Sequence, residues 1–208
     1  QICNIKVMEI FNFSKLKLPI IQAPMAGGFN TPELASVVAN SGGVGSFGFS
    51  FTSPEKIDDI LHTTKKLTSG FINANFFVFK PVKLPEKKVQ EEAIQAIQSL
   101  SFNQKYEINI PKEPFYFDLE SQIEATLKNL PSIITFHLGI PSKNIIKKSQ
   151  SLGIKVGITA TNITEAKSIE NVGADFIVAQ GIEAGGHRGI FNQENIDEEI
   201  KLDHLLIK

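Results

Sequence analysis

The residues best suited to chemistry lie in one stretch, QGIEAGGHRG, from Gln180 to Gly189. An imidazole with an ordinary pKa of about 6.5 can accept a carbon-bound proton at neutral pH, which makes His187 a candidate base. The amide of Gln180 offers a donor and an acceptor to the polar edge of a flavin or a base. Gly185 and Gly186 remove side chains where backbone would meet a ligand. The stretch predicts a ligand-binding loop, with a purely structural loop histidine as the alternative, and no second ligand is spaced to make His187 part of a metal site.

Two further motifs place unusual residues in or after apolar runs. PIIQAPMAGG sets Ala23, Pro24 and Met25 before two glycines, where a flat aromatic cofactor could lie on the backbone, although a turn that needs glycine explains the motif equally well. FINANFFV contains Asn73 and Asn75, whose side chains point the same way along a strand. An unpaired buried amide costs about 1–3 kcal/mol. We therefore expect one asparagine to bond a ligand, unless both satisfy loop backbone.

The remaining histidines and glycines carry weaker signals. His137 ends the apolar run SIITFH, where its ring either faces a site or caps the neighbouring loop, and the residues alone leave both possibilities open. His62 and His204 fall within helical patterns, which favours positions on helix surfaces. Arg188 either meets an anionic substrate or is solvated. The stretch SGGVGSFG departs from the GxGxxG pattern and is weak evidence for a dinucleotide.

Composition excludes several classes of partner. The 208 residues contain 21 basic and 22 acidic side chains, so no charged surface for nucleic acid or membrane is predicted. Cys3 is the single cysteine, which excludes an internal disulfide and favours a reducing, cytoplasmic setting. No apolar run reaches the roughly 18–20 residues that span a bilayer. We expect a small-molecule partner, and we expect residues 1–7 to be upstream or added sequence because Met8 begins a smoother stretch.

Short apolar runs without strict polar alternation recur along the chain, as in strands buried on both faces. Between them, Thr31 and Ser53 stand directly before prolines as helix N-caps, and Asn162 with Glu165 forms a capping-box pattern. These signals predict strands that alternate with helices. The six expected strands lie within residues 18–23, 43–47, 70–78, 132–137, 154–160 and 174–180.

This alternation predicts right-handed βαβ units around a parallel sheet, either a doubly wound sheet or a TIM-type (β/α)8 barrel. Polar and glycine-rich residues follow all six runs, and only a barrel opens all such loops on one face. We therefore expect one α/β-barrel domain over residues 8–208, with a helical insertion at about 80–131 carrying helices at 86–100 and 118–130. The final stretch, DEEIKLDHLLIK, is expected to be the helix after the sixth strand, so the barrel is expected to be truncated after its sixth βα unit.

Four stretches, in this order, resemble the FMN-dependent nitronate monooxygenases, formerly called 2-nitropropane dioxygenases. They are PIIQAPMAGGFNTPELASVVANSGGVGSFG, INANFFV, FHLGIP and VAQGIEAGGHRGIF. The resemblance runs from about Leu18 to Phe191 and is weak through residues 80–131. It implies an α/β barrel that holds FMN non-covalently at the carboxyl ends of its strands. It also implies that an alkyl nitronate, or a nitroalkane deprotonated by the enzyme, reacts with O2 to give a carbonyl compound and nitrite.

The same resemblance assigns roles to individual residues. His187 would be the catalytic base, and His137 would be a possible residue of the substrate or flavin site. The cofactor-binding residues would be Ala23, Pro24 and Met25 along the isoalloxazine, Asn73 and Gln180 on its polar groups, and Gly185 and Gly186 near the ribityl phosphate side. No metal and no reduced nicotinamide are required for this chemistry.

Two alternatives remain open from the sequence. The flavin-dependent enoyl-acyl-carrier-protein reductases carry a similar EAGGH pattern after their sixth strand, but the long segment after NANFFV and the motif FHLGIP favour the monooxygenase. The family's barrel normally continues through strands seven and eight. The chain is therefore expected to be a fragment of a longer protein or a truncated product, and in the second case a non-catalytic remnant is the alternative function.

Overall fold

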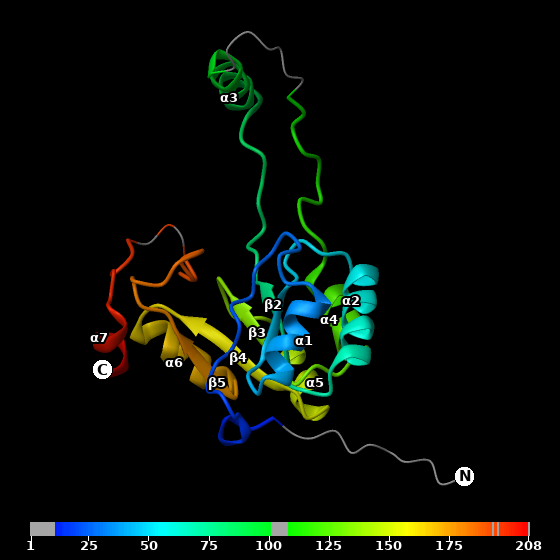
Figure 1. The fold of residues 1–208 in the computed structure, drawn as a ribbon. Coiled ribbons are helices and arrows are strands. Elements are labelled where there is room, and N and C mark those ends of the chain that lie inside the picture. Colours follow the sequence, from blue (N-terminus) through cyan, green and yellow to red (C-terminus); the bar gives the residue numbers. More distant parts are fainter. Residues whose placement is uncertain (1–10, 101–107, 193, 195, 208) are drawn as a thin grey trace. The chain divides into compact units, whose positions relative to one another are not determined.

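The computed structural model describes most of the chain, namely residues 11–100, 108–192, 194 and 196–207. The described residues divide into two compact units. One, here called the sheet unit, lies within residues 1–79 and 117–208, and the other, the insertion unit, lies within residues 80–116. The candidate site residues all belong to the sheet unit, which is described first (Figure 1).

The sheet unit is built on five parallel strands that pair in the order in which they occur along the chain, β1-β2-β3-β4-β5. A doubly wound sheet reverses its strand order at a switch point, whereas a barrel keeps adjacent strands sequential. The sequential order therefore confirms the barrel-type arrangement expected from the sequence. The strands are β1 (Gly45–Gly48), β2 (Ile72–Phe77), β3 (Ile133–His137), β4 (Lys155–Ala160) and β5 (Phe176–Ala179).

The first strand expected from the sequence, at residues 18–23, does not form as a full strand, which corrects the sequence analysis. Only an isolated parallel bridge forms there, between Ile21 and Val44. The Val44 N–H donates to the Ile20 carbonyl at 3.0 Å, and the Gln22 N–H donates to the Val44 carbonyl at 2.9 Å. Pro19 and Pro24 flank this short segment, and neither has an N–H to extend a ladder. The segment therefore lies beside β1 without becoming a full strand.

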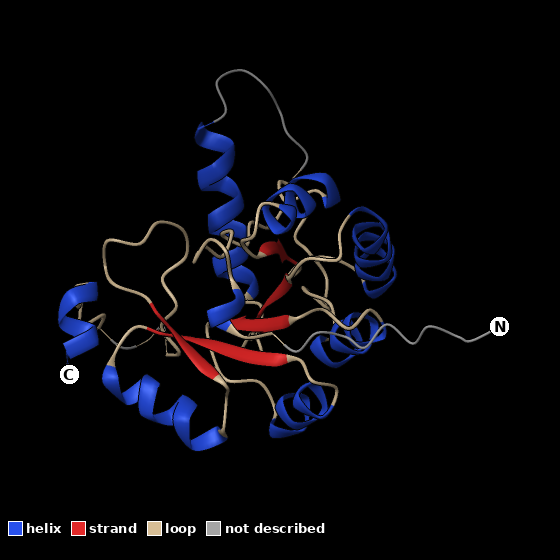
Figure 2. Cartoon of the chain, turned by 60° about the horizontal axis from the view of Figure 1, so that its bottom comes forward, coloured by secondary structure: helices blue, strands red, loops and turns tan. Residues whose placement is uncertain are grey.

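Helices alternate with these strands and lie alongside them (Figures 1 and 2). Three N-caps expected from the sequence are confirmed, because the side chains of Thr31, Ser53 and Asn162 each accept a hydrogen bond from an N–H in the first turn. Asp118 caps a further helix in the same way. The helices of the unit are α1 (Pro32–Asn40), α2 (Pro54–Leu67), α4 (Leu119–Lys128), α5 (Lys143–Ser151), α6 (Ile163–Val172) and the short α7 (Leu202–Ile207), with a 3-10 turn at Phe13–Lys15.

Alternate side chains of β2, β3 and β4 enter the hydrophobic core. On β2 these are Ala74 and Phe76, and on β3 they are Ile134 and Phe136, all with no measurable exposure. Successive side chains of a strand point to opposite faces, so the residues between them face the other side of the sheet. The core thus fixes which residues of each strand are available to a site, and it leaves the asparagines of β2 on the other face.

Among its described residues, the insertion unit contains one helix, α3 (Lys87–Leu100), where the sequence predicts a helix at 86–100. Lys87 with Glu91 and Lys88 with Glu92 form exposed i,i+4 ion pairs at 4.0 and 3.9 Å, each of which contributes little to stability. The second helix expected within the insertion, α4, belongs instead to the sheet unit. Gln122 on α4 is buried and donates to the carbonyls of Phe49 and Thr52, so this helix is tied to the loop after β1.

Close packing of α1 on β1 gives a first test of the fold. A Cβ added at Gly45 would fall inside the van der Waals distance of the Ala35 carbonyl oxygen, which belongs to helix backbone. We expect Gly45→Ala to lower the free energy of unfolding by about 1–3 kcal/mol, measured by urea denaturation. Gly185→Ala is the matched control, because its Cβ would meet nothing within 4 Å and should leave stability unchanged or raise it by up to about 1 kcal/mol. Equal losses in the two variants would contradict this account of the packing.

Candidate functional site

One cleft of the sheet unit, about 1350 Å³ in volume, contains every site residue expected from the sequence. It lies toward the carboxyl ends of the strands, where β2 contributes Phe77 and β3 contributes His137. Much of its remaining wall is apolar, including Phe51 and Val178. The expected residues that line it are Ala23, Pro24, Met25, Asn73, His137, Gln180, Gly185, Gly186 and His187.

Asn73 and Asn75 form a hydrogen-bonded network across three neighbouring strands. The Asn73 amide nitrogen donates to Ser46 Oγ at 3.3 Å, and its amide oxygen accepts from Thr135 Oγ1 at 3.1 Å. The Asn75 amide nitrogen donates to the same Thr135 hydroxyl at 2.9 Å. β1 and β3 thus supply protein partners for both amides, and the ligand role of Asn73 stays a prediction. Asn73 nonetheless lines the cleft, and its second amide hydrogen has no acceptor among the described residues.

The segment from Ala23 to Met25 is held as a fixed shelf along the cleft by a residue that the sequence analysis missed. Asn30 is 6% exposed, its amide oxygen accepts from the Met25 N–H at 2.5 Å, and its amide nitrogen donates to the Ala23 carbonyl at 3.3 Å. A Cβ at Gly48 would lie 2.8 Å from the backbone nitrogen of Ala26, so the end of β1 supports the shelf directly from behind. An asparagine just before the Thr31 cap was the only available signal for this role.

Gln180 closes the loop that carries His187. Its amide nitrogen donates to the His187 carbonyl at 3.0 Å, and its amide oxygen accepts from the Gly189 N–H at 2.7 Å. Both polar ends of this side chain thus bind its own loop. The sequence analysis did not foresee this role, because it considered the Gln180 amide only as a partner for the edge of a flavin. Gly186 has φ +79°, which is a left-handed backbone conformation that favours glycine, and a Cβ at Gly185 or Gly186 would meet nothing within 4 Å.

His137 both lines the cleft and holds the neighbouring loop, which resolves the two possibilities that the sequence left open. Its Nε2 lies 2.9 Å from the His187 carbonyl oxygen, so the ring donates from Nε2 in the matching tautomer. The ring packs against Phe77, with centroids 5.6 Å apart, and against the backbone of Gly189. Burial lowers the pKa of His137 below its ordinary value, while the bond to the His187 carbonyl acts in the opposite direction without reversing the shift.

The imidazole of His187 stands exposed on the cleft wall. Its ring meets Phe77 edge-on, with centroids 5.3 Å apart. Neither ring nitrogen has a hydrogen-bond partner among the described residues, because the loop is held through the backbone carbonyl of this residue. The ring is therefore free to reach a substrate in the cleft while the backbone beneath it is fixed.

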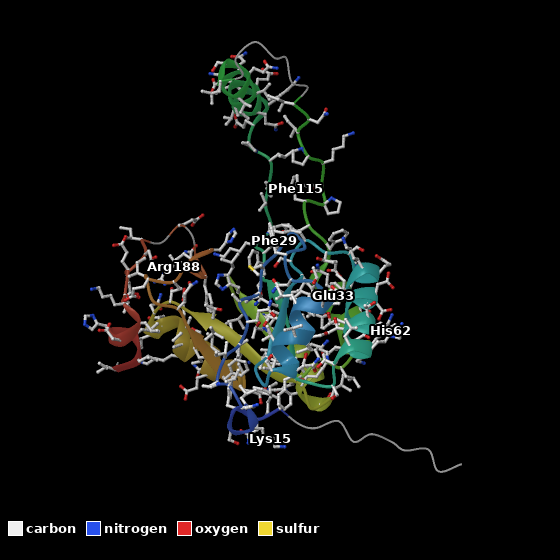
Figure 3. The ribbon with its side chains drawn as sticks, in the orientation of Figure 1. Lys15, Phe29, Glu33, His62, Phe115 and Arg188 are labelled. Carbon is white, nitrogen blue, oxygen red and sulfur yellow. The ribbon has the colours of Figure 1, made fainter. Side chains whose placement is uncertain are left out.

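Charged side chains near this loop are paired internally. Arg188, labelled in Figure 3, binds both carboxylate oxygens of Asp197 at 2.7 and 3.1 Å and donates to the Gln180 carbonyl at 2.6 Å. The sequence left two possibilities for Arg188, contact with an anionic substrate or exposure to solvent. The structure shows instead an ion pair with the carboxylate of Asp197. His62, on the outer side of α2 in Figure 3, and His204 are exposed, as expected for helix-surface residues.

The fold and the cleft together define a class of protein. Sequentially paired parallel strands that alternate with helices, and a cleft at their carboxyl ends, are the arrangement of α/β-barrel enzymes that act on small molecules. The family model for nitronate monooxygenase matches residues 10–207. The chain belongs to the nitronate monooxygenase family.

Individual relatives agree with this assignment. The chain is 37% identical over 192 residues to a nitronate monooxygenase of Paraburkholderia phytofirmans, covering 88% of this chain and 50% of the relative. It is 34% identical over 188 residues to a nitronate monooxygenase of Pseudomonas aeruginosa, covering 89% and 53%. Among solved structures, a nitroalkane oxidase from Streptomyces ansochromogenes matches with a TM-score of 0.79 and 28% identity, over 93% of this chain and 55% of that one. The chain therefore spans about half the length of the curated relatives it matches.

Two searches of the described residues bear on other kinds of site. No helix in the described part of the chain is long and apolar enough to cross a membrane. Within the same residues, no three or more His, Cys, Asp or Glu side chains come together in a group that could hold a metal ion.

The lowered pKa of His137 gives a test of its partly buried position. The unfolded chain takes up a proton on this residue at about pH 6.5, whereas the folded chain does so only at lower pH. Stability should therefore fall as pH drops through the ordinary histidine value toward the folded pKa. We expect His137→Gln to lose less of its unfolding free energy than the wild type between about pH 7.5 and pH 5.5, measured by urea denaturation. The same pH dependence in both proteins would contradict a partly buried ring that resists protonation in the folded state.

Proposed function

We propose that the protein is an FMN-dependent nitronate monooxygenase. It uses O2 to convert alkyl nitronates, or nitroalkanes that it first deprotonates, into carbonyl compounds and nitrite. The observation that carries this proposal is the convergence of nine residues from separate motifs on one cleft, in a chain of the nitronate monooxygenase family. The partners are small molecules, namely the nitronate or nitroalkane and O2.

The residues of the cleft fit a flavin. The shelf at Ala23–Met25 offers a fixed, mostly apolar surface for the isoalloxazine, and Asn73 has a free amide hydrogen for its polar edge. Gly185 and Gly186 leave room for close approach on the phosphate side. The cleft volume of about 1350 Å³ accommodates a cofactor together with a small substrate. When bound, FMN would accept an electron from the nitronate before oxygen reacts.

His187 is the proposed base for neutral nitroalkanes. Its unpartnered ring nitrogens can accept the proton from the carbon beside the nitro group, and Phe77 limits the orientations of the ring. Loss of that proton builds negative charge on the nitro oxygens, for which backbone N–H groups of the glycine-containing loop are suitable donors. Gln180 and His137 hold the His187 carbonyl, so that the base keeps its position relative to the cleft.

The base role predicts a difference between two substrates. A preformed nitronate has already lost its proton, so it does not need the base. We expect His187→Asn to retain FMN and to lose about 10²- to 10⁴-fold in turnover of a neutral nitroalkane, with a much smaller loss on the nitronate. Steady-state oxygen consumption with each substrate, alongside the flavin absorbance, measures this. The control is His62→Asn, exposed on α2, which should behave as wild type. Equal losses on both substrates would remove His187 from the base role.

The source of electrons separates this function from that of a flavin-dependent enoyl-acyl-carrier-protein reductase. With flavin bound and oxygen excluded, we expect an alkyl nitronate to bleach the flavin absorbance, because the nitronate itself is the electron donor. NADH should leave the absorbance unchanged over the same period. Rapid bleaching by NADH would favour a reductase, and a chain that takes up no FMN would favour a non-catalytic remnant.

A further inference from the structure

We propose that Glu165 is a positioning residue for the loop that carries His187. The proposal rests on the proposed function, in which His187 is the base. Glu165 lies in the first turn of α6 and is not among the residues that line the cleft, although its charge acts on the cleft residue His137. Its side chain is nonetheless buried, with 7% of the residue exposed, and no lysine or arginine forms an ion pair with it within the described residues.

Three hydrogen bonds to two different segments hold the carboxylate of Glu165. One oxygen, Oε2, accepts from the Thr161 N–H at 2.7 Å and from the Thr161 hydroxyl at 2.8 Å. The other oxygen, Oε1, accepts from the Phe191 N–H at 2.8 Å. Thr161 directly follows β4, whereas Phe191 lies in the segment between β5 and α7 that also carries His187. The carboxylate therefore joins the end of the His187 loop to the framework of strand and helix.

Helix capping alone does not account for this arrangement. In a capping box the side chain at the third helical position bonds the N–H of the N-cap residue. Here Asn162 caps α6 by accepting from the Glu165 N–H at 2.9 Å, but the Glu165 carboxylate extends past Asn162 to Thr161 and across to Phe191. The positive end of the helix dipole and three donors compensate for the buried negative charge. A buried carboxylate that also accepts a hydrogen bond from a separate loop, here at Phe191, indicates a structural link. A neutral residue would not make this link equally well.

The link matters for His187 because of how the rest of the loop is held. Gln180 holds the His187 carbonyl and the Gly189 N–H from within the loop, and Arg188 pairs with Asp197 in the segment that follows. Gln180 and Asp197 belong to the same segment between β5 and α7 as His187. Side chains from other βα units bind this loop at two of its residues, Glu165 at the Phe191 N–H and His137 at the His187 carbonyl, and the Gln180 N–H donates to the Ala160 carbonyl of β4 at 2.9 Å. If the Glu165 bond is lost, the part of the loop after His187 loses its tie to α6.

Glu165→Gln tests the link with a side chain of the same shape. Glutamine keeps one carbonyl oxygen but presents an NH2 group to the other donors, so either Thr161 or Phe191 loses its acceptor. We expect FMN content to be retained, turnover of a neutral nitroalkane to fall about 10- to 100-fold, and turnover of the preformed nitronate to fall less than about threefold. The matched control is Glu170→Gln, an exposed glutamate on the same helix, which should leave both rates unchanged.

A double-mutant cycle with His187→Asn distinguishes a positioning role from a general loss of structure. If Glu165 acts through His187, then adding Glu165→Gln to His187→Asn should cause no further loss with the nitroalkane. Losses that multiply, or a Glu165→Gln variant that slows both substrates equally, would overturn the proposal. A His187→Asn variant without selective loss on the nitroalkane would instead refute the base role itself, so the two failures are separable.

A second variant keeps the proposal testable if the Glu165→Gln protein does not bind flavin. Glu165→Asp retains the charge but is one methylene shorter, so it cannot reach both Thr161 and Phe191. A selective loss of nitroalkane turnover in this variant, measured with flavin bound, supports the link. Equal losses on both substrates, or wild-type rates on both, would overturn it.

Discussion

In a parallel sheet covered by helices, successive side chains of each strand point to opposite faces, so β2, β3 and β4 supply the core and the cleft at once. Phe76 and Phe136 enter the core, while the next residues along the chain, Phe77 and His137, line the cleft. The pairing of β2 with β3 sets Phe77 directly beside His137. The packing that stabilises the fold therefore also decides which aromatic and polar side chains meet around His187, and a shift of register would move both sets together.

Polar side chains on the cleft face of the sheet need hydrogen-bond partners, and they bind one another. Ser46, Asn73, Thr135 and Asn75 form one network over β1, β2 and β3. Its hydrogen bonds join residues up to 62 positions apart in the sequence, so the network forms only when the three strands are in register. Polar networks of this kind favour one arrangement of the strands over slipped alternatives, because a shift of register would break several hydrogen bonds at once.

Much of this architecture could be predicted from the sequence, because local rules govern it. The apolar runs that became β2 to β5 and the caps at Thr31, Ser53 and Asn162 follow from burial on both faces and from first-turn N–H groups that need acceptors. The grouping of the site residues followed from the parallel direction of the strands. What the sequence does not reveal is which of several possible hydrogen-bond partners a polar side chain binds. Gln180 was expected at a flavin edge, yet both ends of its amide bind the loop, and no pattern of spacing in the sequence reveals that choice.

The way in which the loop is fixed bears on what His187 can do. A base is useful only if its ring is free to take a proton and its position is defined, and these needs conflict when a partner holds the ring itself. Here Gln180 and His137 bind the carbonyl oxygen of His187, and the ring meets only the apolar edge of Phe77 among the contacts described. The position of the residue is thus set through its backbone, and its ring stays available for the proposed proton transfer. Burial lowers the pKa of His137, which favours the neutral form of the ring that makes one of these bonds.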